Sequence, residues 1–229
     1  MRVARGFDVL REVATAPPLA RTGRVSPLRD RLRNEALELA RTEELVDAAY
    51  SYRIVPLDAP AAPWLRAGGE TLHAPRLLPE SGQLTALACA VCTLGARFEQ
   101  RVGTLFAERR NSLALALDEL GNELLFAVSR RAQDRMQADA RRRGLCMAGE
   151  LRAGDPGLAL EAQSAVLRLA QAELIGVRVN QRHLMHPLKS TSIVLGIGID
   201  LPPAHWSRCD DCARRAQCRV VSRPVATTN

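Results

Sequence analysis

Apolar spacing along the chain predicts helices and strands in alternation, without an internal repeat. Helical spacing covers the stretches 27–49, 96–106, 112–143 and 158–175. Ser26 and Pro27 form a helix start before the first stretch, and Gly144 is typical of a helix end after the third. In the first stretch the apolar residues near one face are Leu28, Leu32, Ala36, Leu37 and Leu39. The chain is therefore expected to mix helices with extended segments.

Strand signals fall between these helices. Residues 50–57 alternate between apolar and polar, and 177–199 contains strand-like runs. The apolar run 83–95 fits a buried strand or a helix, and periodicity does not decide between them. Residues 67–78 predict a turn and a short extended piece, whereas the glycine-rich stretch 144–157 predicts a loop.

Composition narrows the class of protein. With 229 residues, 47% of them hydrophobic and 25% charged, the chain can bury a core as one large domain or two small ones. No apolar run approaches the roughly 20 residues that span a bilayer, and charged residues interrupt the N-terminus, so a cytoplasmic protein without membrane contact is expected. The net charge of +7 comes without stacking aromatics or a nucleic-acid motif, so no nucleic acid is expected as a partner. Whether this charge attracts an acidic partner protein is left open by the sequence.

The cysteines give the sharpest chemical signal. Cys209, Cys212 and Cys218 follow a C-x2-C-x5-C spacing in a polar segment, which is typical of zinc or iron–sulfur ligation in a cytoplasmic chain. Cys89 and Cys92 share the C-x2-C spacing but lie in an apolar run, where cysteine behaves as a small hydrophobe. In a strand these two side chains would point to opposite faces, so we expect them in the core.

Three groups of motifs occur in a fixed order between about residues 84 and 200. They are CTLG at 92–95, LDELGN at 117–122, and IGVRV at 175–179 followed by MHPLKSTS at 185–192 and GIG at 196–198. Together they resemble the activation (reactivation) domain of cobalamin-dependent methionine synthase, of which this chain would be a stand-alone relative. The resemblance implies an α+β domain over 1–200 with a twisted antiparallel sheet and flanking helices. A cysteine-containing metal-binding tail would then occupy 201–229.

The family's ligand-binding pattern is altered in this chain. The resemblance implies S-adenosylmethionine held by an acidic side chain on the long helix and by an Arg-x-x-x-Gly-Tyr loop. Here Phe126 matches the helical position, although Glu123 lies one turn earlier. The loop matches 146–150, which has neither the arginine nor the tyrosine. S-adenosylmethionine binding is therefore doubtful, because an unpaired buried charge is costly. Gly149, Lys189 and Ser190 are candidate cofactor-pocket residues, with a turn glycine and a solvated lysine as the alternative for the first two.

A fourth ligand is needed to complete a metal site with Cys209, Cys212 and Cys218. Cys146 is the favoured candidate because it lies where the family's ligand-binding loop is expected, and His205 is the alternative. The group would be an iron–sulfur cluster, with [4Fe–4S] the expected type, or a zinc ion.

Three hypotheses for the function follow. The first is an accessory protein of a corrinoid-dependent methyltransferase system, partnered by a corrinoid protein or methyltransferase, whose cluster reduces cobalamin. The others are a methyl-transfer module that binds S-adenosylmethionine or a corrinoid, and a non-enzymatic protein with structural zinc.

Overall fold

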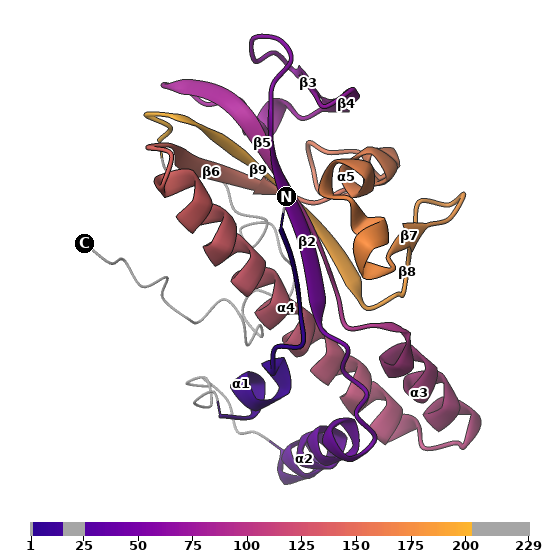
Figure 1. Ribbon diagram of the computed structural model, residues 1–229. Coiled ribbons are helices and arrows are strands. Elements are labelled where there is room, and N and C mark those ends of the chain that lie inside the picture. Colours follow the sequence, from indigo (N-terminus) through magenta and orange to yellow (C-terminus); the bar gives the residue numbers. More distant parts are fainter. Residues whose placement is uncertain (1, 16–25, 203–229) are drawn as a thin grey trace.

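A five-stranded antiparallel sheet forms the centre of the computed structural model, which describes residues 2–15 and 26–202 (Figure 1). Its strand order is β1-β2-β5-β9-β6. The bounds in that order are β1 (Arg2–Arg5), β2 (Ala49–Pro56), β5 (Gln83–Thr93), β9 (Ser190–Ile199) and β6 (Cys146–Leu151). Two small hairpins pair β3 (Trp64–Ala67) with β4 (Glu70–His73), and β7 (Arg178–Val179) with β8 (Met185–His186). The expected α+β class with an antiparallel sheet is confirmed.

Helices cover both faces of this sheet. One face carries α1 (Val9–Thr15), α2 (Pro27–Thr42), α3 (Ala96–Ala107) and the long α4 (Asn111–Arg141). The other carries α5 (Gln163–Ala170) with three 3₁₀ turns, η1 (Pro75–Leu77), η2 (Leu160–Ala162) and η3 (Ala172–Ile175). In Figure 1, α4 and α5 lie on opposite sides of the strands. Each face therefore has its own hydrophobic core.

The apolar run at 83–95 forms the central strand β5, not a helix. Alternate residues of β5 enter the two cores, with Leu87 and Cys89 in one and Ala88 and Cys92 in the other. A strand buried on both faces reads as a continuous apolar run, because neither set of alternate positions meets water. This double burial explains why the sequence pattern did not separate strand from helix.

Three sequence expectations need correction. The loop predicted at 144–157 contains the edge strand β6, and the single helix predicted at 158–175 is the short α5 between two 3₁₀ turns. The α2 face also differs, because Ala36 and Ala40 are buried while Leu28 stays 63% exposed. Small alanines let α2 approach α4 closely, and ion pairs such as Arg33–Glu123 supplement that contact.

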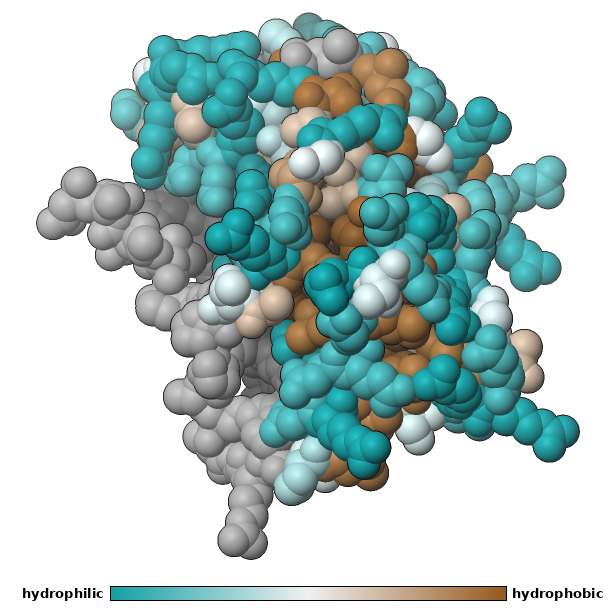
Figure 2. Space-filling view, turned by 60° about the horizontal axis from the view of Figure 1, so that its bottom comes forward, coloured by the Kyte–Doolittle hydropathy of each residue, from teal (hydrophilic) through white to brown (hydrophobic). Residues whose placement is uncertain are grey.

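Hydrophilic residues cover most of the face in Figure 2, with hydrophobic residues between them. No helix in the part of the chain that the structure describes is long and apolar enough to cross a membrane.

Candidate functional site

The sheet opens where β6 leaves β9. Pairing between them runs from Cys146 opposite Gly198 to Leu151 opposite Val194, with a register shift between Ala148 and Leu151. Beyond Leu151 the chain turns away, so residues 190–193 of β9 keep β5 as their one strand partner within the described ranges. A bulge of this kind bends a strand and redirects the residues after it. Here it directs Arg152 toward α4.

A compact polar cluster fills this opening, and we call it the β9 edge site. It consists of Phe126 and Ser129 on α4, Glu150 at the end of β6, Arg152 just after it, and Thr191 on β9. The helix positions 126 and 129 are three apart and therefore share one helix face. The site thus joins α4 to the open half of β9.

Arg152 is the centre of the β9 edge site. Its side chain is 12% exposed, and its Nε and Nη2 donate to Glu150 Oε1 at 3.2 and 2.9 Å. Nη1 donates to Thr191 Oγ1 at 2.9 Å, Nη2 to Ser129 Oγ at 3.3 Å, and the guanidinium carbon lies 5.6 Å from the Phe126 ring centroid. A guanidinium with this many partners is fixed in position.

Lys189 lies at the same end of β9 and is the chain's only lysine. Its Nζ lies 2.7 Å from Asp118 Oδ1 and donates to Asn122 Oδ1 at 2.9 Å. The lysine side chain is 12% exposed, and a Cβ on Gly121 would come within 3.1 Å of its Cε. Lys189 is therefore not a solvated residue. Its contacts hold the N-terminal end of β9 against α4.

Gly149 and Ser190, the other candidate pocket residues, lie within the scaffold. Gly149 has φ +69°, and a Cβ there would come within 2.9 Å of Leu77 Cδ2. Only glycine adopts this conformation at little cost. Ser190 is buried, and its hydroxyl donates to Thr93 Oγ1 at 2.9 Å across to β5. Neither residue belongs to the β9 edge site.

Cys146 lies at the other end of the β9–β6 pair. It is exposed and stands opposite Gly198, one residue before β9 ends at Ile199. Cys209, Cys212, Cys218 and the alternative ligand His205 lie outside the described residues. Within the described residues, 2–15 and 26–202, no group of three or more His, Cys, Asp or Glu residues is placed to hold a metal ion.

Cys89 and Cys92 are core residues, as their apolar setting predicted. Both are fully buried, on opposite faces of β5. Burial raises the pKa of each thiol to about 12, because a thiolate is poorly solvated in the core. These two cysteines are thus inert at neutral pH.

Sequence reasoning missed Arg152. The resemblance assigns the family's arginine-containing loop to 146–150, but the structure places an arginine two residues beyond that stretch, just after the unpredicted strand β6. One signal was present, since Arg152 opens a run with Gly154, Pro156 and Gly157. That composition marks a turn after a strand.

Comparisons with known proteins give one informative result. No family model matches the sequence, and no curated protein matches it. Among solved structures, this chain resembles the crystal structure of the MetH reactivation domain bound to AdoHcy, with a TM-score of 0.65 and 13% sequence identity. The likeness covers 96% of this chain and 86% of that chain. At this identity the comparison establishes architecture: the chain has the fold of the MetH reactivation domain.

Proposed function

We propose that the chain is a reactivation-type accessory module of a cobalamin-dependent methyltransferase system. The likeness to the MetH reactivation domain over 96% of the chain carries this proposal. The β9 edge site supports it, because a fixed arginine beside an open strand edge is a built polar site on rigid elements. The partner would be a corrinoid protein or a corrinoid methyltransferase.

Reactivation of an oxidised corrinoid enzyme tests this function directly. The partner methyltransferase, loaded with cob(II)alamin, is mixed anaerobically with a chemical reductant, with and without this protein. We expect the recovered activity to rise with added protein until the two are equimolar. Recovery equal to that from the reductant alone would contradict the accessory role.

For the source of the electron we propose a cysteine-ligated metal centre on Cys146, Cys209, Cys212 and Cys218. An iron–sulfur cluster there would supply one electron to cobalt, with an external donor to reduce it again. Cys146 supports this ligand set by its exposure and by its place opposite Gly198, because neighbouring strands lie only about 5 Å apart. Cys209 follows Pro202 by seven residues, which reach up to about 25 Å when extended. The tail is thus long enough to meet Cys146.

The metal centre is tested by analysis of iron, sulfide and zinc in anaerobically purified protein. We expect a brown protein whose cluster is lost or converted in Cys146→Ala as fully as in Cys212→Ala. Cys89→Ala is the matched control, because this thiol is buried and inert, and it should keep the full spectrum. Full metal content in Cys146→Ala would remove that residue from the ligand set. A colourless protein with one zinc ion would favour the structural-zinc alternative.

A further inference from the structure

A groove follows the outer edge of the sheet between β1 and α4. It has a volume of about 830 Å³ and is lined by β1, by Phe7 and Tyr50, and by Arg131, Asp134 and Arg135 of α4. All four residues of β1 line it, and β1 pairs with β2 on one side only within the described chain. In an antiparallel strand, alternate residues direct their N–H and C=O groups away from the existing partner. The groove therefore presents backbone hydrogen-bonding groups along its length.

Its charge is mainly positive. Arg2, Arg131 and Arg135 line the groove with Asp134, whereas the Nη2 of the fourth arginine, Arg5, donates to the Leu174 carbonyl at 2.7 Å. Exposed arginines at 141–143 lie at and just beyond the end of α4. Arg2 pairs with Asp139, and Arg131 with Glu12, each at 2.9 Å. A guanidinium has five N–H donors, so these pairs leave further donors available. Arg135 forms no ion pair with any residue that the structure describes.

The floor of the groove is aromatic. The rings of Phe7 and Tyr50 lie 5.5 Å apart, and the guanidinium carbon of Arg131 lies 5.3 Å from the Phe7 ring centroid. Tyr50 is buried, and burial raises the pKa of its hydroxyl above the ordinary value, so this side chain adds no charge to the floor. Val3, on the strand itself, is 40% exposed. An apolar side chain of a bound segment would be shielded from water on this floor. Acidic side chains next to it in the same segment would meet the arginines.

From these features we infer that the groove is a docking site for an extended acidic segment of a partner protein, which adds a strand to β1. Main-chain hydrogen bonds would supply affinity, and alternate side chains would divide between the arginine rim and the apolar floor. Arginines on an edge strand also discourage aggregation. Protection from aggregation would not favour acidic segments over basic ones, whereas a docking site for an acidic segment would. Comparing acidic with basic peptides therefore distinguishes the two roles.

Fluorescence anisotropy with labelled peptides tests the site on the full-length protein. The probe is Glu-Val-Glu-Val-Glu-Val-Glu, whose alternation matches a strand. Its controls are the Lys-Val counterpart and a form with proline at the central valine, which cannot complete the ladder. We expect the acidic peptide to bind at low salt and the Lys-Val peptide not to bind. The proline form should bind about tenfold more weakly, and 0.3 M salt should weaken the acidic peptide by a similar factor.

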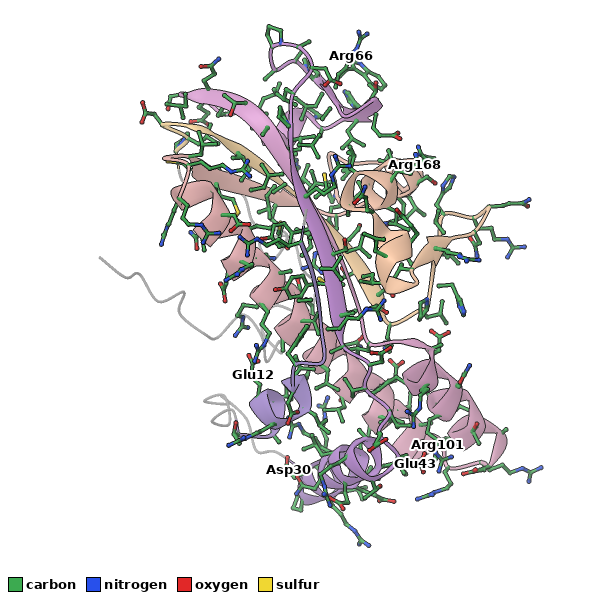
Figure 3. All side chains as sticks on the ribbon, viewed as in Figure 1. Glu12, Asp30, Glu43, Arg66, Arg101 and Arg168 are labelled. Atoms are coloured by element: carbon green, nitrogen blue, oxygen red, sulfur yellow. The ribbon has the colours of Figure 1, made fainter. Side chains whose placement is uncertain are left out.

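Variants locate the binding. Arg135→Glu should weaken the acidic peptide by about tenfold, and Asp134→Arg should strengthen it, because each changes the charge of the rim. Arg66→Glu is the matched control: Arg66 lies on the β3–β4 hairpin, far from the α1 residue Glu12 (Figure 3). Equal binding of the acidic and Lys-Val peptides, or equal effects of the three variants, would overturn the inference. The corrinoid proposal does not depend on this result, since cobalamin reactivation is measured separately.

Discussion

The two ends of β9 have different surroundings. At its N-terminal end, Lys189 and Thr191 meet charged and polar side chains from α4 and the chain after β6. At its C-terminal end, a Cβ on Gly196 would meet the Leu84 side chain and one on Gly198 the Gln83 backbone, and Cys146 is exposed beside them. Side-chain contacts fix the first end, whereas at the second end glycines allow the neighbouring strands to approach closely. A ligand site suits the first, and the second is where the proposed metal-binding tail would attach.

The largest expected effect is at the glycine end. A Cβ on Gly198 would collide with the carbonyl of Gln83 on β5, so Gly198→Ala must push two central strands apart. We expect a loss of about 3 kcal/mol in the free energy of unfolding, measured by urea denaturation. Gly103→Ala is the control, because the helical Gly103 has nothing within 4 Å of a new Cβ and should gain about 0.5–1 kcal/mol. Similar stability in both variants would contradict the close strand contact.

The next effect is at the polar end. Arg152→Leu would leave Glu150, Thr191 and Ser129 without their shared donor, and it should cost about 2 kcal/mol in unfolding free energy. Arg168→Leu removes a two-bond pair with Glu70 whose arginine is largely exposed, and it should cost only about 0.5 kcal/mol. Equal losses would show that the β9 edge site is as solvated as the surface pair.

Some of this architecture could be predicted from sequence, and the failures have physical causes. The opposite orientation of Cys89 and Cys92 followed from strand alternation, although the apolar run itself did not choose between strand and helix. The strand β6 was missed because it lies at an edge, is mostly half-buried and contains Gly149, so it lacks an apolar pattern. Because β6 was missed, Arg152 just after it was missed too, and Arg152 is the central residue of the β9 edge site. Burial of Lys189 depends on Gly121 and α4, which no local pattern reveals.

A smaller effect is expected at the buried cysteines, which are matched in spacing to the tail cysteines. Cys89→Ala should cost about 1 kcal/mol of unfolding free energy, from lost packing alone. Because burial raises the pKa of the Cys89 and Cys92 thiols to about 12, neither should react with iodoacetamide at pH 8 in the folded protein. Mass spectrometry of the labelled protein, with and without a metal chelator, measures the iodoacetamide labelling at each cysteine. Labelling of either residue before unfolding would show that the core opens.

The smallest expected effect is the response to S-adenosylmethionine. Binding its amino-acid group would need a carboxylate for the ammonium and a free arginine for the carboxylate. The helix offers Phe126 at the matching position, and Arg152 already donates to Glu150, Thr191 and Ser129. Calorimetry should therefore detect weak binding or none.

The same contacts predict how binding could be gained. In Glu150→Gln the ion pair with Arg152 is lost, and the guanidinium becomes available to an incoming carboxylate. Affinity for S-adenosylmethionine should then rise, whereas Glu70→Gln, which releases the exposed Arg168, should change nothing. Tight, saturable binding to the unaltered protein would show that Glu150 gives way to the ligand. The β9 edge site would then be a methyl-donor pocket, and the methyl-transfer hypothesis would replace the cluster-bearing one.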